Sequence, residues 1–169
     1  LLDANLSGED LSGMDLSGAR METANLAGIR AVALLGCPAT LPVDWECVQL
    51  NLVGPGADLA AADLAGADLS GADLTAVILD GADLSNAILS HAVLDGASLI
   101  QANLSNATLS NAVLDNADLS DANLQDALLD GASVDSASFE YARASGVDIT
   151  DVDLFGASLT GARLYDLIG

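Results

Sequence analysis

The chain has almost no basic residues. It contains no lysine and one histidine, and its arginines are Arg20, Arg30, Arg143 and Arg163. Against these stand 25 aspartates and glutamates, which give a net charge of −21 at pH 7. Nucleic acids and anionic membranes are bound largely through lysine and arginine. We therefore expect no direct binding to nucleic acid or to a membrane, and a protein as the partner.

Long apolar runs are also missing, although 51% of the residues are hydrophobic. The longest run lies near residues 31–37, far short of the ~18 residues that a membrane-spanning helix needs. Disordered acidic chains are poor in aliphatic side chains, and this chain is dense in leucine. We expect one soluble, folded domain over residues 1–169. Because Leu1 is already in phase with the repeat described next, we expect a trimmed or processed product.

Leucine recurs every five residues. From Leu59 to Leu164 this spacing never slips, and an alanine stands two residues before almost every leucine. The leucine position is filled differently at Val134, Phe139, Ala144 and Ile149, and the alanine position at Val77, Val147 and Val152. A shorter block with the same spacing is centred on Leu6, Leu11, Leu16, Met21 and Leu26.

Neither a helix nor a continuous strand has a period of five, since apolar residues recur every three or four residues in a helix and every two in a strand. We number each repeat from its central leucine, position i. Alanine at i−2 and leucine at i share a face, as in a short strand, and Gly, Asn, Asp and Ser at i+1 and i+2 favour turns. The chain therefore takes short straight steps separated by corners, and such a period indicates a solenoid.

The segments "ADLSG", "ANLSN" and "ADLSD" resemble the A(D/N)LXX motif of the pentapeptide-repeat proteins, over residues 1–31 and 57–166. The resemblance implies an all-β fold, a right-handed quadrilateral parallel β-helix with four repeats per coil and about seven coils. Leucine and alanine then point inward, and positions i−1, i+1 and i+2 point outward. The leucine-centred repeats resemble the branch of the family that lacks phenylalanine centres.

One excursion interrupts the helix at residues 32–56, which hold all three prolines, both cysteines and the only tryptophan. Cys37 and Cys47 are within reach of each other across a loop or short hairpin, and we expect a disulfide. The alternative is two reduced cysteines, one of them packed against Trp45. A disulfide favours a secreted, periplasmic or lumenal protein over a cytoplasmic one. We expect the excursion to cover the side or the N-terminal end of the solenoid.

No catalytic, cofactor or metal site is predicted, and we expect a protein that is not an enzyme. His91 falls at i+2, an exposed turn position, and the serines at i+1 recur as part of the repeat, without a histidine and an acid beside them. Two cysteines and one distant histidine fall short of the four ligands of a structural zinc site.

Residues twenty apart should stack in columns on the surface. One column holds Asp95, Asp115 and Asp135 at i+1, either as a solvated acidic face or as a cation site, although calcium needs six or more oxygens. Another column, at i−1, runs from Asp63 to Arg163. In it, asparagines can form a ladder of amides, and Arg143 and Arg163 are expected to pair with acids such as Asp126 and Asp166.

Two apolar surfaces are candidate interfaces. The first is lateral and consists of Ile88, Val93, Val113 and Leu128 at i−1, where the alternative explanation is simple strand propensity. The second lies at the C-terminal coils and consists of Phe155, Tyr165, Leu167 and Ile168. An end of a β-helix exposes unpaired backbone groups and an open core, so we expect a homodimer through these coils.

The function favoured by these features is that of a non-enzymatic scaffold that presents an acidic rod surface. The alternative is a DNA-mimicking inhibitor of a type II topoisomerase, which some members of the family are. A charge of −21 on ~32 Å of rod is one charge per ~1.5 Å, against one per ~1.7 Å in B-DNA. Against mimicry, the chain has a single phenylalanine centre, Phe139.

Overall fold

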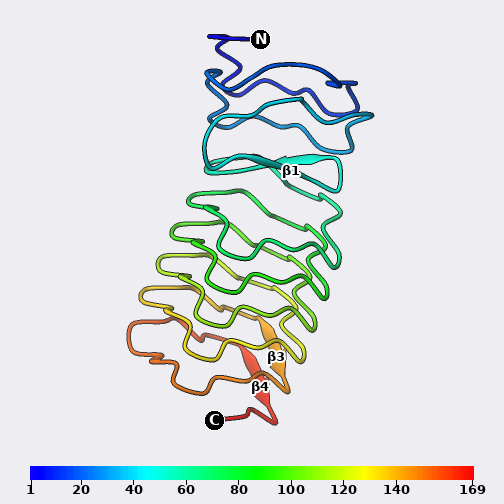
Figure 1. The fold of residues 1–169 in the computed structure, drawn as a ribbon. Coiled ribbons are helices and arrows are strands. Elements are labelled where there is room, and N and C mark those ends of the chain that lie inside the picture. Colours follow the sequence, from blue (N-terminus) through cyan, green and yellow to red (C-terminus); the bar gives the residue numbers. More distant parts are fainter.

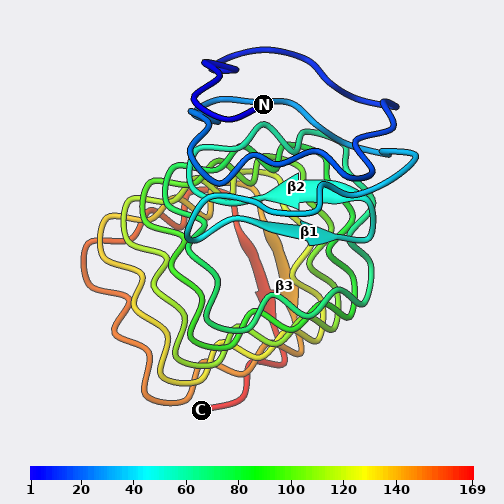
Figure 2. The same ribbon diagram turned by 45° about the horizontal axis from the view of Figure 1, so that its top comes forward.

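The structure, a computed structural model that describes residues 1–169, is a stack of coils with the two termini at opposite ends (Figure 1). Parallel bridges join residues twenty apart, as between Asp63 and Asp83 and between Asn103 and Asn123. Four pentapeptides therefore complete one coil, and each repeat supplies one side. Viewed obliquely from the N-terminal end, the coils lie one behind another with closed outlines (Figure 2).

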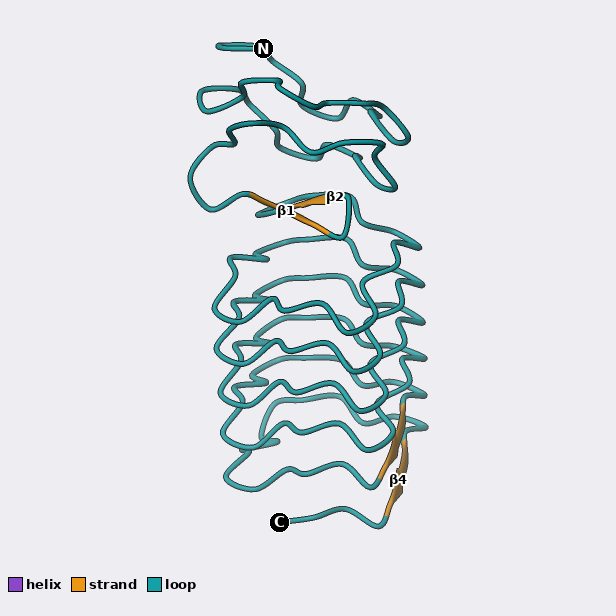
Figure 3. Ribbon diagram, turned by 45° about the vertical axis from the view of Figure 1, so that its right-hand side comes forward, coloured by secondary structure: helices purple, strands orange, loops and turns teal.

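Regular strands are few and short because each side of a coil is a single straight step. The hairpin strands β1 (Glu46–Val48) and β2 (Asn51–Val53) pair antiparallel. Near the C-terminus, β3 (Arg143–Ser145) and β4 (Arg163–Tyr165) pair in parallel (Figure 3). Elsewhere the coils are joined by single parallel bridges, nearly all at position i−1. None of the chain forms a helix long and apolar enough to cross a bilayer.

The corners are turns that place position i+2 at positive φ. In the repeat centred on Leu59, the N–H of Ala62 donates to the Leu59 carbonyl at 3.0 Å, and Ala61 has a φ of 56°. Type II turns require this left-handed conformation, which glycine and asparagine adopt at the least cost. That requirement explains why Gly and Asn recur at i+2.

Leucine and alanine line the interior, as the repeat predicts. Leu89 and Leu109 are fully buried, and the alanines beside them, such as Ala87 and Ala107, are fully buried too. Each buried leucine contributes roughly 1.5–3 kcal/mol relative to an exposed one. Phe139 and the undersized Ala144 that follows it are both buried, together with Val147. These positions exchange volume within a narrow interior.

The departure from the regular wall differs from the predicted excursion at residues 32–56. Gly36 still bridges Asp15, and Thr40 still bridges Arg20. The wall therefore continues to Thr40. The irregular segment begins after this residue and not at residue 32, where the prediction placed its start.

The β1–β2 hairpin lies between the N-terminal coils and the long stack (Figures 1 and 3). The prediction that it covers the side or the N-terminal end is wrong. The physical reason is that β2 is fully buried and bonds to the preceding coil as a wall segment would. The Leu52 N–H donates to the Ala31 carbonyl at 2.9 Å, and the Leu34 N–H donates to the Leu50 carbonyl at 2.8 Å.

The hairpin also joins two parts of the core. Leu52 belongs to a cluster of 8 buried residues in the N-terminal coils, and Val53 to a cluster of 37 in the long stack. Trp45 packs against both clusters. Gly54 is required beside it, because a Cβ there would lie 2.4 Å from the indole ring.

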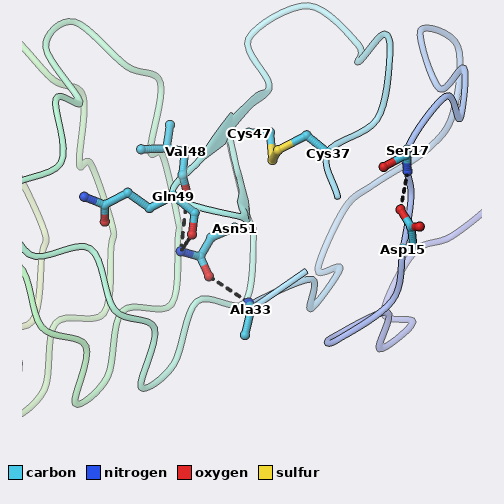
Figure 4. The surroundings of a disulfide bond; sticks show 8 residues. All are labelled: Asp15, Ser17, Ala33, Cys37, Cys47, Val48, Gln49 and Asn51. Atoms are coloured by element: carbon cyan, nitrogen blue, oxygen red, sulfur yellow. Dashed lines mark hydrogen bonds between the residues drawn. A yellow bond between two sulfur atoms is a disulfide. The ribbon is translucent and has the colours of Figure 1, made fainter. Parts of the chain in front are cut away.

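Cys37 and Cys47 are joined by a disulfide, with their Cα atoms 6.0 Å apart. The bond ties the wall segment that contains Gly36 and Thr40 to β1 (Figure 4). The closed loop is short, so its entropic stabilisation is modest, ~2–3 kcal/mol.

Candidate functional site

Each regular repeat leaves one backbone N–H without a backbone partner. In the repeat centred on Leu84, the N–H groups of Asp83, Leu84, Asn86 and Ala87 all donate to backbone carbonyls at 2.8–3.0 Å. The remaining N–H, that of Ser85, donates to the Asp83 carboxylate at 3.0 Å. An aspartate or asparagine at i−1 therefore caps the N–H of its own turn.

The same cap recurs along the whole solenoid. It is formed by Asn5, Asp10, Asp15, Asn25, Asp58, Asp63, Asp68, Asp73, Asn103, Asp118, Asn123, Asp148 and Asp153. A large share of the acidic residues thus has a structural task that the fold itself explains.

At several of these turns the cap favours the ionised form of the carboxylate. At Asp68 the hydroxyl and then the backbone N–H of Ser70 lower the pKa below its ordinary value. At Asp148 the hydroxyl and N–H of Thr150 lower the pKa in the same way. At Asp83 the N–H of Ser85 is the largest cause of the lowered pKa. These hydrogen bonds therefore stabilise the negative charge of Asp68, Asp83 and Asp148.

Glu22 gives a testable pH dependence. Its carboxylate accepts a hydrogen bond from the Thr40 hydroxyl and pairs with Arg20. The Thr40 hydroxyl, the Glu22 backbone and Arg20 lower the pKa of Glu22 to about 2. Because the folded pKa is depressed, this stabilisation is present above the unfolded value of ~4.3 and is lost as the pH falls through about 2. A carboxyl-carbon NMR titration should show this midpoint, and Thr40→Val should raise it. An unchanged midpoint in that variant would show that the hydroxyl is not the cause.

The predicted acidic column of Asp95, Asp115 and Asp135 is also engaged with the protein. Asp115 accepts from the backbone N–H of Asp135 at 3.0 Å and from the Ser133 hydroxyl at 2.5 Å. Asp95 accepts from the Asn116 amide at 2.9 Å. Asp115, at i+1, thus caps the turn of the repeat one coil later, in which Ser133 occupies i−1 and cannot provide a carboxylate. No group of three or more His, Cys, Asp or Glu side chains is arranged to hold a metal ion.

Histidine and serine side chains form no nucleophile and base pair. His91 lies exposed at a corner with a φ of 60°. The hydroxyls of Ser70 and Ser120 donate to Asp68 and Asp118, the aspartates of their own repeats. These hydroxyls therefore support the turns.

One side of the solenoid changes its charge along its length. The i−1 column on this side consists of Asp63, Asp83, Asn103, Asn123, Arg143 and Arg163. The predicted asparagine ladder is present and extends to an aspartate: Asn123 donates to Asn103, and Asn103 donates to Asp83, each at 3.0 Å. The column thus passes from acidic through neutral to basic.

The predicted ion pairs of Arg143 and Arg163 with Asp126 and Asp166 are wrong. The ion pairs of the structure are those of Arg20 with Glu22 and of Arg30 with Asp58. Asp126 instead accepts from the Gln125 amide at 3.2 Å, and its carboxylate lies over the next corner, where a Cβ on Gly146 would be 2.3 Å from it.

The lateral patch, defined as Ile88, Val93, Val113 and Leu128, lies on two adjacent sides of the coil. Ile88 and Leu128 are bridged through Thr108, and Val93 is bridged to Val113. Ile88 and Leu128 are 42% and 40% exposed, and the two valines are half-buried.

At the C-terminal coils, Phe155 is 87% exposed, and Tyr165, Leu167 and Ile168 are exposed beside the open end of the core. Apolar side chains alone line a cavity of about 30 Å³ there. Sequence reasoning missed other exposed apolar residues, namely Leu35, Val43, Leu50 and Ile78. Ile78 was identifiable, because it stands at i−1 in an unbroken stretch of the repeat.

Stacked coils of twenty residues, a leucine and alanine interior and carboxylate-capped corners define a β-helical solenoid repeat protein. A family model described as pentapeptide repeats matches eight copies, over residues 3–30 and in overlapping segments over 56–161. The chain belongs to the pentapeptide-repeat family, which confirms the resemblance of its motifs. A search of curated proteins by sequence found no match.

Solved structures of the same family are similar to this chain. HetL, a pentapeptide repeat protein involved in heterocyst differentiation regulation in the cyanobacterium Nostoc, is 28% identical, with a TM-score of 0.52 over 99% of this chain and 88% of its own. A pentapeptide repeat protein from the thylakoid lumen of Arabidopsis thaliana is 36% identical, with a TM-score of 0.56 over 57% of this chain and 68% of its own. A further Nostoc pentapeptide repeat protein is 35% identical, with a TM-score of 0.50 over 60% and 83%.

Proposed function

We propose that the protein is a non-enzymatic scaffold, an acidic rod that presents its sides to a protein partner. The lateral patch is the observation that carries this proposal. Ile88 and Leu128 stand in a column whose other members include the turn-capping Asp68 and Asp148. Ile88 and Leu128 cannot cap their turns, and the N–H groups of Ser90 and Asp130 have no protein acceptor. A hydrogen bond of this kind contributes about 1 kcal/mol.

Strand propensity accounts for the β-branched Ile88, Val93 and Val113 but not for Leu128. Leucine is not β-branched, yet Leu128 is 40% exposed at a position where aspartate would cap the turn. The patch is an apolar centre with aspartates at its margins, which is the usual composition of a protein contact. A partner with a small apolar surface flanked by basic residues would complement it.

The partner surface is tested by retention experiments with three immobilised proteins. The parent and a Ser98→Asp/Ser138→Asp control should retain the same protein from the cells of origin. The Ile88→Asp/Leu128→Asp variant should lose it. The control adds the same charge at the same repeat position on another side of the coil. Circular dichroism should show the same fold for all three, since stacked aspartates occur naturally at Asp63 and Asp83. Equal retention by the patch variant would overturn the lateral contact.

The charge density supports a second candidate, a DNA-mimicking inhibitor of a type II topoisomerase. The lateral patch and the change of the Asp63–Arg163 column from acidic to basic both interrupt the negative surface. A DNA backbone carries its charge without such breaks. These interruptions favour the scaffold.

The winding follows from the family resemblance. We infer that the coils are right-handed and form the quadrilateral β-helix of the family, in about seven coils. The advance of twenty residues per coil, observed along the long stack, supports four sides.

The disulfide supports a location outside the cytoplasm, in a secreted, periplasmic or lumenal space. The relative from a thylakoid lumen supports the same proposal. Alkylation of thiols in intact cells of origin, followed by mass spectrometry, should leave Cys37 and Cys47 unmodified. Modification of both cysteines would place the protein in a reducing compartment.

Self-association is expected through the C-terminal coils. The exposed Phe155, Tyr165, Leu167 and Ile168 surround an open apolar interior, so pairing two such ends removes apolar surface from water. Sedimentation velocity should show a dimer that strengthens with salt, because salt screens the like charges. The Phe155→Ser/Leu167→Ser/Ile168→Ser variant should be monomeric. A parent that is monomeric at all salt concentrations would contradict the dimer. A variant that is still dimeric would indicate that the interface is the lateral patch.

A further inference from the structure

Two arginines lie together without acidic partners. Arg143 and Arg163 face each other across the parallel β3–β4 pair, where neighbouring strands are ~4.8 Å apart. Like charges directly opposite in a sheet destabilise it. Both arginines are exposed. Neither forms an ion pair, whereas Arg20 and Arg30 do. In a chain with 25 acidic residues, an unneutralised pair of cations needs an explanation.

A polar groove runs beside this pair. It has a volume of about 380 Å³ and is lined by Gln101, Asp121, Tyr141, Arg143, Gly161 and Arg163. Apart from the single carboxylate of Asp121, its polar side chains can all donate hydrogen bonds. Asp121 and Tyr141 both stand at i+2 and are twenty residues apart, so Asp121 lies one coil before Tyr141 in the same column. The Asp121 N–H donates to the Glu140 carbonyl, and the Tyr141 N–H donates to the Thr160 carbonyl.

Gly161 fixes the position of the aromatic ring in the groove. A Cβ on Gly161 would lie 2.5 Å from the Tyr141 ring, so the ring packs directly against the glycine backbone. Arg143 follows Tyr141 by two residues, and Arg163 follows Gly161 by two residues. The Tyr141 ring and the two arginines thus line the same groove.

We propose that this groove binds a phosphate-type oxyanion, either inorganic phosphate or a phosphate monoester. Guanidinium groups donate paired hydrogen bonds that match phosphate oxygens. A dianion neutralises both arginines at once, whereas a single carboxylate neutralises one. The total charge of −21 opposes anions at long range, but at ~0.1 M salt charges more than about 10 Å away are largely screened. The groove lies apart from the lateral patch and does not depend on the scaffold proposal.

The four arginines make the site directly observable. In a proton–nitrogen NMR spectrum, each arginine contributes one Nε–Hε signal, which single Arg→Gln variants assign. Inorganic phosphate, phenyl phosphate and acetate are titrated separately at constant ionic strength. Phosphate should move the Arg143 and Arg163 signals together and saturably, with a Kd below about 10 mM, while Arg20 and Arg30 stay in place. Phenyl phosphate that binds more tightly than phosphate identifies a monoester site, and equal binding identifies a site for the free ion. Binding of acetate as tight as phosphate, equal movement of all four signals, or no saturation would overturn the proposal.

Variants separate binding from a structural role. Arg163→Gln should weaken phosphate binding about tenfold or more, as expected for the loss of a charge-assisted hydrogen bond. Arg20→Gln, the matched control, should leave binding unchanged. The Arg143→Gln/Arg163→Gln variant should keep or exceed the Tm of the parent without phosphate, because it removes like-charge repulsion, and should lose the rise in Tm that phosphate gives the parent. A lower Tm together with an unchanged response to phosphate would overturn the assignment.

Discussion

Leu109→Asp is expected to unfold the coils around it. Leu109 is fully buried in the stack of inward leucines, and every neighbour in the interior is apolar. An aspartate there would place an unpaired carboxylate where neither water nor a donor reaches it. Together with the lost leucine, the expected fall in the free energy of unfolding is on the order of 4–5 kcal/mol. Thermal and urea unfolding followed by circular dichroism would measure it.

Thr108→Asp, one residue earlier, is the matched control and should not lower the free energy of unfolding. Thr108 stands at i−1 in the column that contains Asp68 and Asp148. An aspartate there can cap the N–H of Ser110, which has no protein acceptor. We expect an unchanged or slightly higher stability, by up to about 1 kcal/mol. Equal destabilisation by the two variants would contradict the inward and outward assignment of the repeat.

Asn51→Asp is expected to release the hairpin. Asn51 is the only buried polar residue of the chain. Its amide donates to the carbonyls of Val48 at 3.3 Å, Gln49 at 3.0 Å and Asp63 at 3.1 Å. Its carbonyl accepts from the Ala33 N–H at 3.1 Å (Figure 4). The side chain thus connects the hairpin to the coils on both sides of it. Aspartate has the same shape but turns an oxygen toward three carbonyls.

The expected loss for Asn51→Asp is about 3 kcal/mol or more, since each buried group left unsatisfied costs about 1–3 kcal/mol. Trp45 is the only tryptophan and packs against both core clusters, so its fluorescence reports on the hairpin. The fluorescence transition should move to a lower temperature in the variant. Asn106→Asp makes the same chemical change at an exposed corner and should leave the transition in place. A parent-like transition in Asn51→Asp would show that these bonds do not hold the hairpin.

The period of five was sufficient to predict the interior and the stacking. A register fixed from Leu59 to Leu164 leaves one inward arrangement, because any shift would bury the mostly polar or turn-forming residues at i−1, i+1 or i+2. The asparagine ladder followed from the same register, since residues twenty apart must adjoin. Position i+2 was predicted as a turn, and its positive φ follows from the type II corner.

The hairpin could not be placed from the sequence. Between Leu26 and Leu59 the spacing is not a multiple of five, and a wall segment, an insertion or a cover all fit that length. The position of Asn51 is set by contacts with Ala33 and Asp63, on either side of the hairpin, which no local pattern reveals. The arginine column was predicted, but the Asp126 carboxylate lies over the corner at Gly146, a direction that no local pattern reveals.

A DNA gyrase supercoiling assay in the presence of this protein separates the scaffold from the DNA mimic most directly. The scaffold predicts unchanged supercoiling even at a large molar excess of the protein over gyrase. An Asp95→Asn/Asp115→Asn/Asp135→Asn variant, which lacks the acidic column, should behave the same. Inhibition that rises with the concentration of the parent, and that weakens in this variant, would contradict the scaffold and establish the mimic.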